Sequence, residues 1–328
     1  MICATTPIIG ADAFFVRVGA PCSGIEGFVL VTVFLVLYVS LFRQDLRFPQ
    51  VLLLFPLGLV ASWMFNVLRI TVLLVIGIEG EPELAVGGFH SHAGWLTFTL
   101  LSLLLISLSR TVPAFAPRTD VTTPTRPGFL DDPAVAQIGP FIVFMASGLL
   151  ASTFIMEPAL AYPLRAAAMA IALWLVRGWF LALPWRLDPV ALGTGLVIGL
   201  AWLFTSPAAT EAHPVAGLGA AAAAFWVVTR LLGTVVFVPA IEEALFRGYL
   251  IERIAPTRKA LRMVLAVIIG AVLFAALHDR WLAAGIAGLV FGALVWRSDN
   301  LTDAILSHAA ANATIGTYAV ATGAWHVI

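Results

Sequence analysis

The chain has 328 residues, of which 61% are hydrophobic and only 11% are charged. An ordinary soluble domain carries about 25% charged residues, so this composition excludes a soluble fold and indicates a polytopic membrane protein. The formal net charge is zero, which argues against a nucleic-acid partner. Two cysteines, Cys3 and Cys22, are too few for a disulfide framework, and we expect no signal peptide in the first residues.

The order of apolar runs predicts an all-α fold, a polytopic transmembrane helical bundle of about ten or eleven membrane helices in two parts. Residues 1–24 are predicted to be a non-spanning lead-in. The run 51–78 is predicted to be one tilted helix or a broken one. The other predicted helices are 27–42, 93–109, 137–156, 163–183, 188–205, one span plus a second helix within 215–255, 260–277, 281–297 and 301–322.

Residues 111–135 are rich in proline, threonine and charge, a composition typical of a linker. We therefore divide the chain into a first membrane domain at 1–110, a linker at 111–135 and a second membrane domain at 136–328. The polar motifs of the second domain all lie within 215–322.

Arginines follow the first and third apolar runs at Arg43, Arg47, Arg110, Arg118 and Arg126. The loop 79–90 carries acidic residues and no lysine or arginine. The positive-inside rule then puts the arginine-rich ends in the cytoplasm, and Cys22, Arg69 and His90 near the outer face.

Four arginines of the second domain lie within or near predicted helix ends: Arg165, Arg177, Arg186 and Arg230. A long basic side chain at such a place extends to the membrane interface while its stem stays in apolar surroundings. We therefore expect these four arginines to reach the interface rather than to take part in a site.

The segment Val238–Tyr249 carries Glu242, Glu243 and Arg247 among apolar residues. Ionisable groups at membrane depth are costly and usually functional. On a helix, Glu243 and Arg247 are four residues apart in the favourable order for an ion pair. Glu242 lies about 100° around the helix from its neighbour, so it would remain free to face a cavity as a base. The alternative is that all three residues form a buried packing clamp.

Two further polar insertions follow, His278 at the end of FAALH and the pair His308 and Asn312 in HAAAN. With Glu242 they supply a carboxylate, two imidazoles and an amide, which together can activate a water and stabilise an oxyanion. Interhelical hydrogen bonding is one alternative. Zinc binding through Glu242, His278 and His308 is another. No His-Glu-x-x-His segment is present, which excludes a zincin.

The three motifs resemble those of the CPBP intramembrane proteases, relatives of the CAAX prenyl endopeptidases: Glu242-Glu243-x-x-x-Arg247, Phe274-x-x-x-His278 and His308-x-x-x-Asn312. The resemblance implies that Glu242 and His278 activate the attacking water. It implies that His308 and Asn312 hold the oxyanion, while the other two charged residues of the first motif support the site. It also implies a glutamate-type mechanism that requires no cofactor, with zinc as the alternative.

In the first domain, Cys22 lies in a loop of small residues beside a predicted helix start. A helix N-terminus and a nearby cation lower the pKa of a thiol, and Arg69, which interrupts an apolar run on the same side, can supply that cation or bind an oxyanion. A histidine can act as general acid or base for acyl transfer. The alternative for a lone cysteine is a small buried hydrophobe.

This region resembles the catalytic part of the exosortases, membrane Cys/Arg/His transpeptidase-like enzymes, through Cys22-Ser23-Gly24, Asn66-x-x-Arg69 and His90-x-x-x-Gly94-x-x-x-Phe98. The resemblance implies catalytic roles for Cys22, Arg69 and His90, with His90 favoured over His92. Exosortases have several membrane helices before the cysteine, whereas this chain begins 21 residues before it. We therefore expect either a longer natural start or a reduced version of the exosortase unit.

With both sets of motifs in one chain, the sequence resembles the exosortase E/protease fusion. That fusion is associated with proteins carrying a VPEID-type C-terminal sorting signal. They imply a multi-pass protein of the bacterial inner membrane, with membrane lipid and membrane-anchored protein substrates as partners. The competing hypotheses are a non-catalytic membrane scaffold or immunity-type protein, in which the polar clusters pack helices, and a zinc-dependent membrane peptidase.

Overall fold

The computed structural model describes residues 8–11, 14–17, 24–43, 46–85, 89–115, 128–207 and 215–328. Within these ranges the fold is all-α apart from one hairpin, as the sequence predicts. Strand β1 (Ile8–Ala11) pairs antiparallel with β2 (Phe14–Arg17), and Ile8 lies opposite Arg17. This hairpin falls in the predicted lead-in, where the sequence pattern indicates no strand.

The chain divides into two compact units. Unit 1 comprises residues 1–126 and 148–158, and unit 2 comprises residues 127–147 and 159–328. The boundary after residue 126 lies inside the proline- and threonine-rich segment 111–135. The short stretch 148–158 clusters with unit 1, although the sequence assigns it to the second membrane domain.

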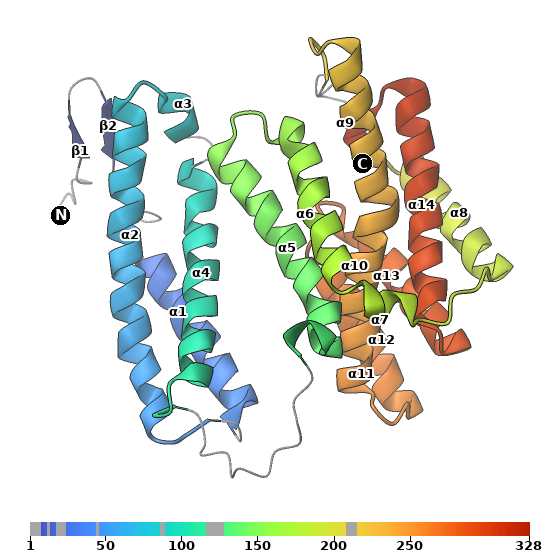
Figure 1. The fold of residues 1–328 in the computed structure, drawn as a ribbon, viewed down its shortest axis with the longest axis horizontal. Coiled ribbons are helices and arrows are strands. Elements are labelled where there is room, and N and C mark those ends of the chain that lie inside the picture. The colour runs from blue at the N-terminus through green and yellow to red at the C-terminus, as the bar shows by residue number, and fades with distance from the viewer. Residues whose placement is uncertain are drawn as a thin grey trace, which may run out of the picture. The chain divides into compact units, whose positions relative to one another are not determined.

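Unit 1 is built on three helices, α1 (Ile25–Leu41), α2 (Leu54–Ile78) and α4 (His90–Thr111), each in contact with the other two (Figure 1). A 3-10 turn at Gln50–Leu53 precedes α2, and the short α3 (Pro82–Leu84) follows it. The apolar run that could have been one helix or a broken one is therefore one helix. Four fully buried side chains mark the centre of this unit: Leu35, Leu54, Leu101 and Leu105.

The predicted helix 163–183 is divided into α6 (Tyr162–Leu175) and α7 (Arg177–Leu181). The other remaining helices are α5 (Pro133–Phe154), α8 (Pro189–Phe204), α9 (Ala220–Leu232), α10 (Val238–Glu243), α11 (Leu250–Ile254), α12 (Ala260–Ala275), α13 (Trp281–Ser298) and α14 (Leu301–Thr322). Helix α14 contacts α8, α10 and α13, so it lies among the other helices of unit 2 (Figure 1).

The prediction for residues 215–255 was wrong. The stretch 215–255 does not form one span plus a second helix, because α9, α10 and α11 belong to a single helical run, Ala220–Ile254, of 35 residues. The joints are the π-helical segments Gly233–Phe237 and Ala244–Tyr249. A π-helical turn accommodates an extra residue without ending the helix, so the run continues through Pro239.

Six described helices are long and apolar enough to cross a membrane, and three shorter apolar helices accompany them. The six are 50–78, 92–111, 133–154, 158–175, 220–254 and 281–298. Helix α14, which the sequence also predicts as a span, is not among them. Its polar side chains lower its hydropathy, and several of them, including Asp303, Ser307 and His308, are buried against neighbouring helices.

The two helices α8 and α14 have well-defined ends. The Oδ1 atom of Asp188 accepts two backbone N–H groups of the first turn of α8, and Pro189 occupies the first helical position. The Oδ1 atom of Asn300 accepts the N–H of Thr302 at the start of α14. Helix α14 ends at Gly323, whose φ of 75° is a left-handed conformation that glycine adopts without strain.

Small residues let α8 and α14 approach closely. A Cβ atom on Gly195 would overlap the carbonyl oxygen of Ser307, and one on Gly199 would lie 2.7 Å from the carbonyl oxygen of Ala311. Close backbone approach at small residues is a common way to pack membrane helices. The position of α14, which carries His308, therefore depends on these two glycines.

We expect Gly195→Ala to destabilise the protein by about 1–3 kcal/mol, because the added methyl group overlaps backbone atoms of α14. The matched control is Gly193→Ala on the same helix, where a Cβ atom would meet nothing within 4 Å. That control is expected to leave the unfolding midpoint unchanged or slightly raised, since alanine favours helix over glycine. Denaturant unfolding in detergent measures both variants, and equal midpoints would contradict the packing argument.

Candidate active sites

The three motifs of unit 2 meet at one cavity of about 310 Å³. Glu242 comes from α10, His278 from the turn after α12, and His308 and Asn312 from α14, and all four line this cavity. Segments up to 70 residues apart in sequence therefore bring a carboxylate, two imidazoles and an amide together. We call this space the unit 2 cavity.

Behind this cavity lies the ion pair that the sequence predicts. Arg247 Nη1 donates to Glu243 Oε1 at 3.1 Å, and both side chains are almost completely buried. Arg247 Nη2 donates to the carbonyl oxygen of Gly288 on α13 at 2.9 Å. His308 Nδ1 lies 2.9 Å from the same Glu243 oxygen. One carboxylate thus connects α10, α13 and α14 through its partners.

Glu242 remains outside that ion pair, as predicted. It lines the unit 2 cavity, is only 4% exposed, and its Oε2 atom is buried without a hydrogen-bond partner among the described residues. A buried carboxylate oxygen without a donor is costly, and such atoms in native structures call for an explanation in terms of water, ligand or catalysis. The geometry leaves Glu242 able to accept a proton or a hydrogen bond from the cavity.

The hydrogen-bond partner of His278 fixes its tautomer. Its Nδ1 atom lies 2.8 Å from the carbonyl oxygen of Phe274. A carbonyl can only accept, so Nδ1 carries the hydrogen and, in the neutral ring, Nε2 is left as an acceptor. The ring also packs against Phe274, with 4.5 Å between ring centroids. The Phe274-x-x-x-His278 spacing is therefore explained by the last helical turn before the histidine.

The imidazole of His308 is held on two sides. Its Nδ1 atom faces Glu243 at 2.9 Å, and its ring stacks on Phe291 with centroids 5.0 Å apart and planes 18° apart. A carboxylate that is ionised accepts a hydrogen from Nδ1, which leaves Nε2 as the nitrogen available to the cavity. The second predicted imidazole is thus oriented as firmly as the first.

Asn312 is oriented by an unusual backbone group. Its Nδ2 atom donates to the carbonyl oxygen of Thr234 at 2.8 Å. Thr234 belongs to the π-helical segment, in which Val238 N–H bonds to the carbonyl of Gly233, five residues earlier. In the same register the next donor would be the N–H of Pro239, which proline lacks. The carbonyl of Thr234 is therefore left to accept from Asn312.

The zinc alternative concerns Glu242, His278 and His308. Among the described residues, no group of three or more His, Cys, Asp or Glu side chains is placed to hold a metal ion. The Nδ1 atoms of His278 and His308 both face protein acceptors, an arrangement in which Nε2 is the atom of each ring that could ligate a metal. The three proposed ligands, Glu242 and the two histidines, share a cavity but do not form a metal centre in this structure.

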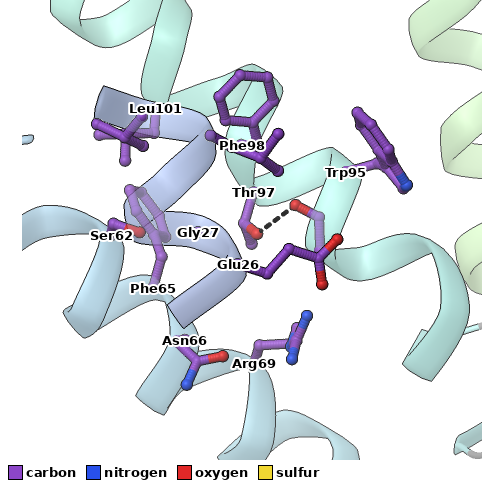
Figure 2. Close-up of a pocket in the computed structure, with 13 residues that line it drawn as sticks. Glu26, Gly27, Ser62, Phe65, Asn66, Arg69, Trp95, Thr97, Phe98 and Leu101 are labelled. Carbon is purple, nitrogen blue, oxygen red and sulfur yellow. Dashed lines mark hydrogen bonds between the residues drawn. The ribbon is translucent and has the colours of Figure 1, made fainter. Parts of the chain in front are cut away.

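Unit 1 contains a second cavity, of about 270 Å³, between α1, α2 and α4. Figure 2 shows the side chains of Glu26, Asn66 and Arg69 around this space. A Cβ atom on Gly94 would lie 2.7 Å from Arg69 Nη1, so this glycine leaves room for the guanidinium. This steric requirement explains why the His90-x-x-x-Gly94 motif has a glycine at its last position.

The start of α1 lies close to Asn66, which lines the same cavity. Gly24, two residues after Cys22 in sequence, has a φ of 82°, and a Cβ atom there would lie 3.2 Å from Asn66 Nδ2. Cys22 itself lies outside the described residues. His90 begins α4, but its side chain is not described. Of the three predicted residues in this unit, the structure therefore places the side chain of Arg69 alone.

Sequence reasoning missed several residues that line the cavities. Arg165 and Arg230 do not meet the expectation that they extend to the interface, because both line the unit 2 cavity. Arg186 is half-exposed and pairs with the buried Asp303, with 2.8 Å between Nη2 and Oδ2. Glu26 lines the unit 1 cavity, and an acidic residue in the first turn of an apolar helix is a sequence signal that could have indicated it.

The six candidate spans define a multi-pass membrane protein, and two family models, both of membrane peptidases or transpeptidases, match parts of the chain. Residues 223–314 match the family model of Rce1-like type II CAAX prenyl endopeptidases, and residues 7–107 match that of the transmembrane exosortases of the EpsH type. Both resemblances drawn from the motifs are confirmed, so an exosortase-like segment precedes a CAAX-protease-like segment in this chain. No curated protein and no solved structure gives a significant match.

We expect Glu243→Gln to destabilise unit 2 by about 3–5 kcal/mol, because it leaves the Arg247 charge buried without its counter-charge. Glu242→Gln, the same chemical change one residue earlier, breaks no ion pair and serves as the control. Denaturant unfolding in detergent should separate the two variants clearly. Equal stability of both would show that the Glu243–Arg247 pair does not hold this part of the fold.

Proposed function

We propose that unit 2 is an intramembrane endopeptidase of the glutamate type. The observation that carries this proposal is the unit 2 cavity, where the unpartnered Glu242 carboxylate and the acceptor nitrogen of His278 face the same space. A water between them loses a proton to Glu242 as its oxygen attacks the scissile carbonyl carbon. The proton then passes to the leaving nitrogen as the carbon–nitrogen bond breaks.

Two groups can donate hydrogen bonds to the carbonyl oxygen as negative charge develops on it. Asn312 Nδ2 has a second N–H besides the one given to Thr234, and His308 can donate from Nε2 when it is protonated. Donors fixed before the reaction in a water-poor site stabilise such an oxyanion strongly.

Glu242→Gln and His278→Ala are each expected to lower peptide cleavage by about 100-fold or more, the usual contribution of a general base. Purified protein in detergent micelles is incubated with a synthetic peptide library, and mass spectrometry identifies the products. The matched control is Glu252→Gln, an exposed acidic residue on the same helical run. It should leave cleavage unchanged.

The same assay distinguishes the competing functions. Cleavage that persists in both variants would favour a non-catalytic role for the motif residues in helix packing. Cleavage that is lost on chelation and restored by zinc would favour a zinc peptidase. The glutamate-type mechanism requires cleavage that resists the chelator and depends on Glu242.

We further propose that residues 7–107 form an exosortase-type cysteine enzyme, with Cys22 as nucleophile, Arg69 as anion-binding group and His90 as acid and base. The support is the family match together with Arg69 and Asn66 lining one cavity. The substrates would be membrane-anchored proteins with a C-terminal sorting signal, in the bacterial inner membrane. The two units would then make this chain an exosortase–protease fusion.

Cys22→Ser is expected to abolish cleavage of such a sorting signal, because a serine hydroxyl at this place is a far weaker nucleophile than a thiolate. The control is Cys3→Ser, the other cysteine of the chain. Cells expressing each variant with a tagged sorting-signal protein are compared by immunoblot for the processed form. Processing that continues with Cys22→Ser would rule out Cys22 as nucleophile.

A further inference from the structure

Two arginines line the unit 2 cavity together with the proposed catalytic residues. Arg165 comes from α6 and Arg230 from α9. Both guanidinium groups lie over the ring of Tyr162, with Cζ 5.6 Å and 4.2 Å from its centroid. Neither arginine has a salt bridge to an acidic residue in the part of the chain that the structure describes. The cavity thus contains two positive charges that no described Asp or Glu side chain neutralises.

The hydrogen-bond donors of these arginines are also incompletely used. Arg165 Nε is buried and has no partner among the described residues. Arg230 Nη2 donates to the main-chain oxygen of Ile328 at 2.9 Å. Each guanidinium has five N–H donors in a planar fork that matches a carboxylate, and unmet donors in a buried place are costly. An anion that bridges the two groups would satisfy both charge and hydrogen bonding.

The structure already places a peptide main chain at this point. After α14 the chain turns at Gly323 and returns to the cavity, where Val327 and Ile328 are among the lining residues. Trp202 Nε1 donates to the main-chain oxygen of Val327 at 3.1 Å, next to the contact between Arg230 and Ile328. This segment is a short 3-10 turn, Trp325–Val327, and its contacts with Trp202 and Arg230 are made through main-chain oxygens. The side chains of this place therefore already bind main-chain groups, which favours a peptide as its ligand.

We propose that Arg165 and Arg230 form a carboxylate-binding subsite that fixes a peptide substrate relative to Glu242. The inference rests on the proposed peptidase function of this cavity. The carboxylate can come from the C-terminus of the peptide or from an acidic side chain, because a guanidinium pair binds both in the same way. Val327 and Ile328 form part of the wall of this subsite.

The test measures binding rather than turnover, in the Glu242→Gln protein. A synthetic peptide library is prepared in three forms: free C-terminal acid without Asp or Glu, C-terminal amide with Asp and Glu, and C-terminal amide without acidic residues. Peptides retained by the protein in detergent micelles are quantified by mass spectrometry. We expect at least one carboxylate-bearing form to be retained about ten-fold more than the neutral form, as one charge-assisted hydrogen bond provides.

Arg165→Gln and Arg230→Gln should each remove this preference while the neutral form is retained as before. The unchanged retention of neutral peptide shows that these variants are folded. Arg253→Gln, an exposed arginine on the same helical run as Arg230, is the matched control and should keep the preference. The form that is preferred identifies the source of the carboxylate, either the C-terminus or an acidic side chain.

Equal retention of all three forms, or a preference that survives both arginine variants, would overturn the subsite. Vesicles can be added to the same assay as competitors. If phosphatidylglycerol vesicles lower the retention of every peptide and phosphatidylcholine vesicles do not, the arginines bind a lipid phosphate instead. Because binding is measured without turnover, these outcomes are independent of the proposed catalytic mechanism. Preferential binding by a protein whose wild type cleaves nothing would contradict the peptidase proposal while leaving the subsite intact.

Discussion

The buried contact between Arg247 and Glu243 is the constraint on which the rest of unit 2 depends. Two opposite charges at membrane depth are tolerated only when their geometry and further hydrogen bonds compensate for lost hydration. Here the compensation comes from neighbouring helices, through the carbonyl of Gly288 and the imidazole of His308. Satisfying one ion pair therefore fixes α10, α13 and α14 together, and Glu242 has no salt bridge among the described residues.

A second constraint acts along the helical run that carries both glutamates. A π-helical segment and a proline within one run leave the carbonyl of Thr234 without a backbone donor. The amide of Asn312 takes that place, and α14 can supply it because Gly195 allows α14 to pack closely on α8. An apparent irregularity in one helix thus orients a polar group on another, in a cavity where orientation matters for chemistry.

Local periodicity explains how much of this could be predicted from the sequence. The Glu243–Arg247 pair and the contact of His278 with the carbonyl of Phe274 join residues four apart, so spacing alone indicates them. The continuous run 220–254 could not be predicted, since hydrogen-bond register within a helix leaves no mark in hydropathy. The position of Arg165 and Arg230 at the cavity could not be predicted either. The local sequence around a helix-end arginine is the same whether its side chain extends to the interface or into a cavity. The predicted roles of Cys22 and His90 remain predictions.

The two units, each taken by itself, place an arginine among apolar helices by the same means. Gly94 on α4 gives room to the guanidinium of Arg69, and Gly288 on α13 lies 3.1 Å, measured from a Cβ atom placed on it, from Arg247 Nη2. A planar guanidinium needs the space of a side chain on the neighbouring helix, and glycine also exposes a carbonyl that can accept from it. An arginine inside an apolar bundle therefore requires a small residue at the facing position of the adjacent helix. A glycine at that position indicates that the guanidinium has a specific place in the packing.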